Sequence, residues 1–169
     1  GRGFQLQGDG PLLVGGGYGV APLVFLARRA RAGSAIRAAI GAASADDLLL
    51  VPELEALGVR VATSTEDGSA GHRGLVTDLV DAWWDEAAPD GLYACGPHGM
   101  LEAVERLVAA RGVPAQLAWE AYMRCGIGIC GSCVHRGRVL CVEGPVLEAP
   151  ARTRGVGKSD VVTPVGEGK

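Results

Sequence analysis

Five short apolar runs alternate with helical patterns through the first two-thirds of this 169-residue chain. Most runs end at glycine or at polar turn residues, and the segments between them have the period of amphipathic helices. This alternation is typical of an α/β fold in which helices connect parallel strands. We therefore predict a five-stranded doubly wound parallel sheet that binds ligands at the carboxyl ends of its strands. The expected strands are 11–17, 35–42, 59–65, 92–95 and 114–120, and the expected helices are 19–32, 46–57, 74–87 and 99–111.

Four cysteines follow the last expected strand with the spacing C-x4-C-x2-C-x7-C. The first three have the spacing of plant-type 2Fe–2S ligation. Glycines between them allow a tight loop whose amides can face the sulfurs. The pattern favours a 2Fe–2S cluster and one-electron transfer. Zinc and unligated structural thiols are the alternatives, although zinc sites usually pair short C-x2-C knuckles. The candidate metal ligands are Cys125, Cys130, Cys133 and Cys141.

A glycine-rich turn ends the first expected strand and reads G-x-G-x-x-P. Glycine lets the backbone approach a pyrophosphate, and the following helix N-terminus favours negative charge. The same turn is also compatible with a structure that binds no ligand. Its candidate cofactor-binding residues are Gly15, Gly16, Gly17, Gly19, Val20, Ala21 and Pro22.

Three other strand ends carry candidate residues. Residues 65–67 could bind a ribose or could only stabilise their own turn. Cys95 lies too far from the other cysteines to be a cluster ligand, and a buried hydrophobic role is the commoner fate of such a thiol. Glu120 is expected to close an apolar strand, where a carboxylate needs a partner. Asp46 and Asp47 follow the second strand without Arg or Lys, so we expect NAD rather than NADP.

Composition excludes several classes of function. The net charge is −3 and there is no basic block, which argues against nucleic acid as the main partner. No apolar run is long enough to span a bilayer, and no signal peptide is evident. We therefore expect a cytoplasmic protein, in which cysteines more often bind metal or take part in redox chemistry than form disulfides. No nucleophile–base pair appears, so no catalytic residue is assigned.

Five segments, taken in their order along the chain, carry a family resemblance: GGGYGVAPL, TEDGSAGHRG, YACGPHGML, WEAYMRCGIGICGSC and CVEGPV. Together they resemble the ferredoxin–NADP reductase superfamily, and within it the iron–sulfur electron-transfer subunits of type B dihydroorotate dehydrogenases. The resemblance implies an oxidoreductase subunit of pyrimidine biosynthesis. It would pass electrons from an FMN-containing catalytic subunit through a 2Fe–2S cluster and FAD to NAD+, in a heterotetramer with that subunit.

The resemblance also implies roles for individual residues. The glycine-rich turn and the 95–100 turn would hold NAD, with Cys95 near the nicotinamide, and the four later cysteines would carry the cluster. Residues 65–67 would lie near the nucleotide, and Glu120 and Met123 beside the flavin–nicotinamide contact. Outside the glycine-rich turn, the implied cofactor-binding residues are Thr65, Glu66, Asp67, Cys95, Gly96, Pro97, Met100, Glu120 and Met123.

We expect an NAD-binding domain at 1–117, a 2Fe–2S domain at 118–149 and a flexible tail at 150–169. Members of the family begin with an antiparallel FAD barrel, and the first residues here resemble the junction after it. The chain alone is therefore expected to bind FAD poorly and to show little activity. The gap from Cys133 to Cys141 is shorter than in the family, which predicts a tight hairpin around 135–142.

Two other functions remain compatible with these motifs. One is the small subunit of a flavin-based ferredoxin:NAD(P) oxidoreductase or of a hydrogenase diaphorase. The other, of a different class, is a non-catalytic zinc-binding interaction module.

Overall fold

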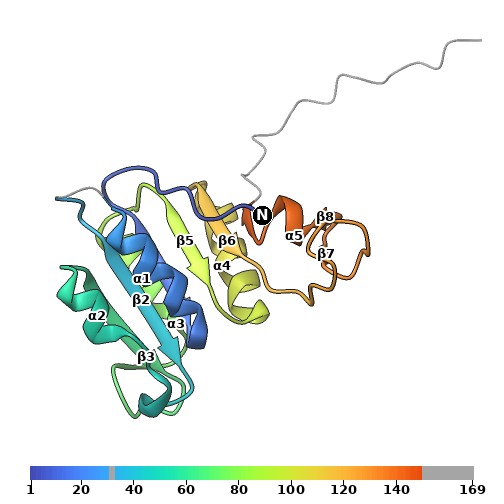
Figure 1. The fold of residues 1–169 in the computed structure, drawn as a ribbon. Helices are drawn as coiled ribbons and strands as arrows, with labels where there is room; N and C mark the ends of the chain where they lie inside the picture. Colours follow the sequence, from blue (N-terminus) through green and yellow to red (C-terminus); the bar gives the residue numbers. More distant parts are fainter. Residues whose placement is uncertain (31–32, 150–169) are drawn as a thin grey trace, which may run out of the picture.

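A computed structural model of the protein describes residues 1–30 and 33–149. The fold is built on one central sheet (Figure 1). The expected tail at 150–169 lies outside the described residues. The sheet order is β4-β3-β2-β1-β5-β6-β9, with β9 antiparallel and all other neighbours parallel. The strands are β1 (Leu12–Gly16), β2 (Arg37–Ala42), β3 (Arg60–Thr65), β4 (His72–Arg73), β5 (Leu92–Cys95), β6 (Ala115–Ala118) and β9 (Val146–Glu148).

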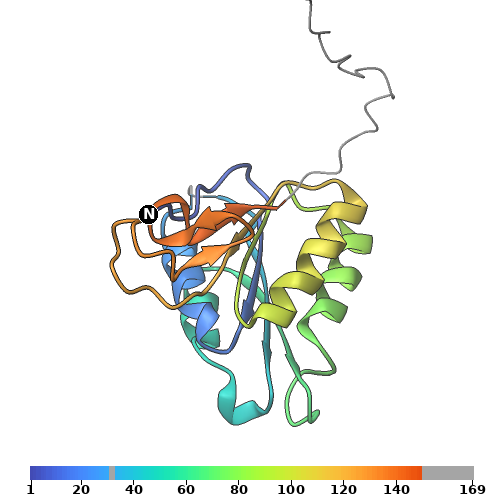
Figure 2. The same cartoon turned by 90° about the vertical axis from the view of Figure 1, so that its right-hand side faces the viewer.

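The five-stranded doubly wound parallel sheet is confirmed, and the structure adds β4 and β9 at its edges. Helices cover both faces, α1 and α2 on one and α3 and α4 on the other (Figure 2). Alternate β1 residues therefore pack in opposite directions, with Leu13 toward α1 and Leu12 and Val14 toward α3 and α4. The helices are α1 (Val20–Arg28), α2 (Val51–Ala56), α3 (Val76–Glu86) and α4 (His98–Arg111). None of these helices has the length and apolar character of a membrane span.

Three of the expected helices and strands differ from the structure. The expected helix at 19–32 ends earlier, at Arg28. The expected helix at 46–57 is a short 3-10 turn, η2 (Ala45–Asp47), and then α2, because Leu50 adopts a left-handed φ of 57° between them. The last parallel strand ends at Ala118, and the chain then leaves the sheet. Glu120 is therefore exposed, so the expectation of a carboxylate at the end of a buried strand was wrong.

A small lobe formed by residues 120–144, which we call the cysteine lobe, lies beyond β6 (Figure 1). It contains the hairpin of β7 (Val134–His135) and β8 (Arg138–Val139), followed by α5 (Leu140–Glu143). Arg136 and Gly137 both have positive φ, as a two-residue type I′ turn requires. The tight hairpin is thus confirmed, but it ends earlier than expected, and Cys141 lies on α5 instead.

Candidate functional site

A cavity of about 1250 Å³, here called the larger cavity, opens at the carboxyl ends of β1, β5 and β6. The strand order reverses between β1 and β5, and doubly wound sheets bind ligands at such a point. The side chains of Tyr18 and Phe25 line it although they are mostly exposed. Of the residues expected from the sequence, those that line it are Gly16, Gly17, Gly19, Pro22, Cys95, Gly96, Pro97, Glu120 and Met123.

The floor of the larger cavity is made where two turns pack backbone to backbone. A Cβ atom on Gly19 would overlap the carbonyl group of Cys95 and lie 2.6 Å from the amide nitrogen of Gly96. A Cβ atom on Gly16 would lie 2.9 Å from Cδ of Pro97. Helix α1 starts at this turn without an acidic residue or a side-chain cap, so its N-terminus favours an anion. The two glycines therefore create a surface that suits a pyrophosphate.

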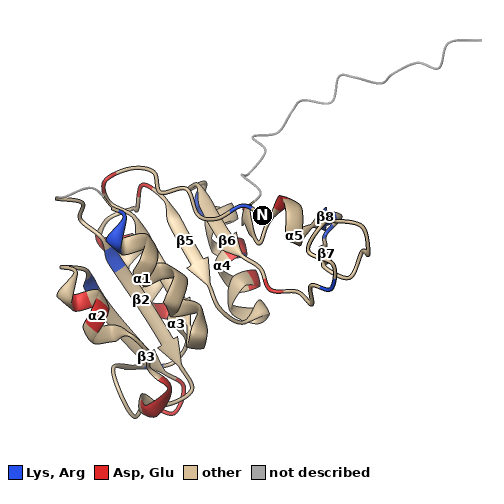
Figure 3. Ribbon diagram, in the orientation of Figure 1, with Lys and Arg blue, Asp and Glu red and all other residues tan. Residues whose placement is uncertain are grey.

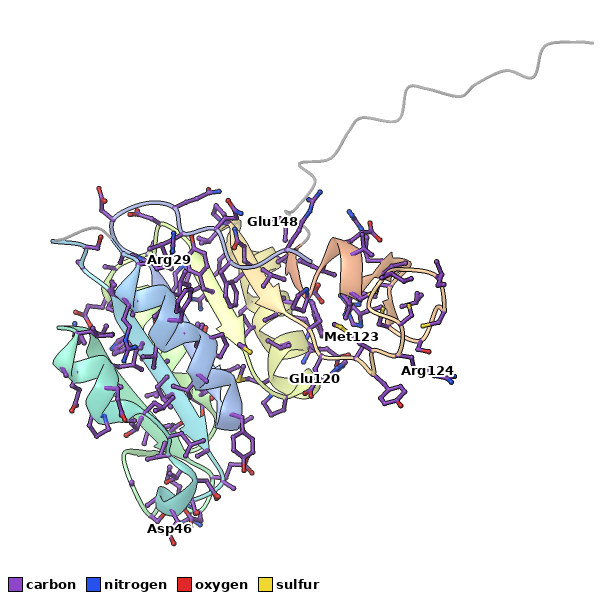
Figure 4. All side chains as sticks on the ribbon, viewed as in Figure 1. Arg29, Asp46, Glu120, Met123, Arg124 and Glu148 are labelled. Atoms are coloured by element: carbon purple, nitrogen blue, oxygen red, sulfur yellow. The ribbon has the colours of Figure 1, made fainter. Side chains whose placement is uncertain are left out.

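Two titratable side chains meet on the wall of the larger cavity. Burial raises the pKa of the Cys95 thiol, and the nearby Glu120 carboxylate raises it further. Cys95 is therefore a protonated, neutral thiol at pH 7. Figure 4 labels Glu120 and Met123 in the first residues of the cysteine lobe, just after β6. The structure thus brings these expected residues together although they are distant from Cys95 in sequence.

A smaller cavity of about 510 Å³ lies at the carboxyl ends of β2 and β3. It shares Gly16, Gly17 and Pro97 with the larger cavity, so the two cavities meet at the glycine-rich turn. Asp47 and Glu66 line it, and acidic residues gather around the turns after β2 and β3 in Figure 3. Asp46, labelled in Figure 4, is exposed at the tip of its turn and does not line the cavity.

Two of the residues expected near the nucleotide instead stabilise their own loop. The buried Thr65 hydroxyl donates to the carbonyl oxygen of Ala70 at 2.7 Å and accepts from its amide at 3.0 Å. The Asp67 carboxylate accepts from the Ser69 hydroxyl and amide, which lowers the pKa of Asp67. Of residues 65–67, Glu66 lines the smaller cavity, and Thr65 and Asp67 line neither of the two cavities.

The remaining expected residues lie around the glycine-rich turn. Met100 lines the smaller cavity. Gly15 and Val20 are buried, and Ala21 is exposed outside both cavities. Sequence reasoning missed Gly41 and Ser64 in the smaller cavity and Trp119 in the larger one. The sequence did contain a clue to Gly41, because a glycine inside a strand often marks the close approach of another group.

The four cysteines of the cysteine lobe lie as two pairs. Cys125 and Cys130 lie close enough to shift each other's pKa, and Cys133 raises the pKa of Cys141. The amide of Cys141 also donates to Sγ of the buried Cys133 at 3.4 Å. In the described part of the chain, no three His, Cys, Asp or Glu side chains group closely enough to hold one metal ion. Two pairs of thiols fit a 2Fe–2S cluster, in which each iron takes two protein ligands, better than a single four-coordinate zinc.

Backbone amides face the first pair of thiols. The amides of Ile127, Cys130 and Ile129 donate to Cys125, and together with the Cys130 side chain they lower its pKa to about 6. The Ser132 hydroxyl and amide lower the pKa of Cys130 in the same way. Gly126 and Gly128 have positive φ, the conformation that turns successive amides toward an anion. The loop therefore stabilises thiolates, the form of cysteine that binds metal.

Because their pKa values shift in opposite directions, Cys125 and Cys95 should react differently with iodoacetamide. In metal-free protein, we expect alkylation of Cys125 to reach half of its maximal rate near pH 6, since the thiolate is the nucleophile. Alkylation of Cys95 should rise only above the ordinary thiol range. Peptide mass spectrometry across pH 5 to about 10 would measure both rates. Similar profiles for the two thiols would contradict this assignment.

Comparison with known proteins gives two family matches. Residues 13–106 match the oxidoreductase NAD-binding domain, and residues 120–151 match the iron–sulfur cluster binding domain of dihydroorotate dehydrogenase B. The first match includes the glycine-rich turn and most of the sheet. The second includes all four cysteines of the lobe.

Curated relatives share both parts. The chain is 46% identical over 149 residues to the probable dihydroorotate dehydrogenase B (NAD(+)) electron transfer subunit of Methanothermobacter thermautotrophicus, covering 86% of this chain and 55% of the relative. It is 40% identical to the protein of the same name from Methanopyrus kandleri, covering 86% and 56%. The chain thus spans little more than half the length of these relatives.

One solved structure is similar over both parts. It is an NADH-dependent reduced ferredoxin-NADP oxidoreductase, described for flavin-based electron bifurcation. The TM-score is 0.75 at 33% sequence identity, and the match covers 88% of this chain and 56% of the other.

Proposed function

Because the chain belongs to the oxidoreductase NAD-binding domain family, we propose that it is the NAD- and cluster-binding part of a dihydroorotate dehydrogenase electron transfer subunit. One observation carries this proposal: a lobe with two pairs of thiols adjoins a cavity whose floor is formed by the two glycine-containing turns after β1 and β5. A cluster transfers single electrons, whereas reduction of NAD+ needs a hydride, so a flavin must act between them. The proposed route runs from a 2Fe–2S cluster through FAD to NAD+, as a step of pyrimidine biosynthesis in the cytoplasm.

In this proposal, the NAD-binding domain is 1–117 and the cluster domain is 118–149. Gly16, Gly17 and Gly19 would hold the pyrophosphate, and the smaller cavity would take the adenosine part. Cys95 would face the nicotinamide as a neutral thiol, which adds no charge beside the reacting ring. Glu120 and Met123, which the cysteine lobe contributes to the wall of the larger cavity, would face the flavin.

The cysteines and their amides would hold the cluster. The N–H groups around Cys125 and Cys130 would stabilise its negative charge. The side chains of Tyr122, Ile127 and Ile129 are mostly exposed on the same lobe. We assign this apolar surface to contact with an FMN-containing catalytic subunit, in a heterotetramer, because electrons must enter near the cluster.

Anaerobic reconstitution with iron and sulfide tests the cluster assignment. We expect about two iron atoms per chain and a rhombic EPR signal after reduction. Stoichiometric zinc without bound iron would instead support a zinc-binding interaction module and overturn the proposal.

The similarity to the ferredoxin-NADP oxidoreductase favours a second candidate, the small subunit of a flavin-based ferredoxin:NAD(P) oxidoreductase. The electron donor distinguishes the two. Reduction of the cluster by dihydroorotate through an FMN partner would support the first function, and reduction by ferredoxin alone would support the second.

The acidic wall of the smaller cavity should select against a 2′-phosphate. We expect NADH to bind more tightly than NADPH, because Asp47 and Glu66 would repel the additional charge. Asp47→Asn should reduce the ratio of the NADPH and NADH dissociation constants by about tenfold, which corresponds to about 1.4 kcal/mol. Asp46→Asn is the matched control, since Asp46 lies outside the cavity. Calorimetry with both nucleotides would measure the effect, and tighter binding of NADPH by the unaltered chain would contradict it.

A further inference from the structure

The ring of Trp119 joins the cysteine lobe to the NAD-binding part. Trp119 follows β6, is 3% exposed and lines the larger cavity. Its ring stacks on the His135 ring of β7, with centroids 4.2 Å apart and an interplanar angle of 27°. The Arg136 guanidinium lies 5.1 Å from the Trp119 centroid. A single side chain therefore forms part of the cavity wall and also supports the hairpin.

Further contacts hold the same junction. Nε2 of His98, at the start of α4, donates to the carbonyl oxygen of Glu120 at 2.9 Å, and the His98 ring meets the Trp119 ring edge-on at 5.5 Å. Arg136 pairs with Glu105 of α4 at 2.5 Å. These contacts tie the beginning of the lobe and the tip of its hairpin to one helix. Besides the Trp119 stack, the lobe is thus fixed to α4 at two points.

The stacked ring is also close to the cysteines in the chain. Cys133 lies two residues before His135, and Cys133, Leu140 and Trp119 belong to the same hydrophobic core. A displacement of the hairpin would therefore move the buried thiol of Cys133. A smaller side chain at position 119 would remove the stack and leave a space between the lobe and the sheet.

We propose that Trp119 is a positioning residue: stacked on His135, it holds the cysteine lobe at one distance and orientation from the larger cavity. The proposal rests on the function proposed above, in which one electron at a time leaves the cluster for a flavin in that cavity. Two such transfers supply the electron pair of each hydride. Electron transfer falls steeply with distance, so the stack would set the rate of this step without any contact between Trp119 and the metal.

Hydrogen exchange tests the structural part of the proposal in the metal-free chain. Trp119→Ala should speed exchange at the amides of Val139 and Leu140 by about tenfold, because the hairpin loses its support. Trp119→Phe keeps an aromatic ring and should leave exchange close to that of the unaltered chain. Trp84→Ala is the control, since Trp84 packs on Arg111, away from the lobe. Unchanged exchange in Trp119→Ala would overturn the proposal.

Stopped-flow measurement tests its consequence in the iron-reconstituted chain with an excess of FAD, because the chain alone is expected to bind FAD poorly. With iron content and the EPR signal unchanged, Trp119→Ala should slow electron transfer between NADH and the cluster by about tenfold, and Trp119→Phe should restore it. A rate that falls only in proportion to lost iron would show a purely structural role and overturn the proposal. If the unaltered chain binds no iron, the proposed function fails, whereas the exchange experiment still decides whether Trp119 holds the lobe.

Discussion

Cys125→Ser should reduce bound iron from about two atoms per chain to almost none after anaerobic reconstitution. The serine oxygen is a poor substitute for a thiolate that three backbone amides already stabilise. The other three cysteines of the lobe should behave in the same way when replaced singly, because each pair of thiols would serve one iron. Iron analysis and the EPR signal of the reduced protein would measure the loss.

Cys95→Ser is the matched control for these variants. Cys95 is a half-buried thiol in the larger cavity and belongs to neither pair. The Cys95→Ser variant should therefore retain the iron content of the unaltered chain. Full iron in Cys141→Ser would show that another residue is the fourth ligand, and loss of iron in Cys95→Ser would contradict the assignment of both sites.

Gly19→Ala should lower the free energy of unfolding by about 3 kcal/mol, at the upper end of the effects of overpacking. The φ of Gly19 is −63°, so alanine fits the backbone conformation and the effect is purely steric. The added methyl group would meet the backbone of Cys95 and Gly96, which cannot move without displacing β5. The two turns that form the floor of the larger cavity would separate, so NADH binding should weaken as well.

Gly99→Ala is the control for this steric effect. Gly99 lies in the first turn of α4, and a Cβ atom there would meet nothing within 4 Å. The free energy of unfolding of the Gly99→Ala variant should stay the same or rise by less than about 1 kcal/mol, because alanine favours the helix. Urea denaturation of both variants would measure the difference. Equal stability of the two variants would contradict the close packing of the turns.

The site residues show where sequence reasoning reached its limit. The glycine-rich turn and the 95–97 turn were expected at strand ends, and both line the larger cavity. Residues 65–67 were expected there by the same reasoning, yet Thr65 and Asp67 bond within their own loop. A strand end predicts where a side chain is, but its neighbours determine whether its polar atoms remain available to a ligand.

The sequence alone determined the parallel sheet and the loop that gathers the thiols, because hydrophobic period, glycine position and cysteine spacing act over short stretches of chain. Only the tertiary structure decided how the thiols pair, which acidic residues line the smaller cavity, and that Trp119 packs on His135. Those contacts join segments that are distant in the sequence. The order of the strands and the turn of the hairpin bring these segments together, and no local sequence pattern specifies which of them will be in contact.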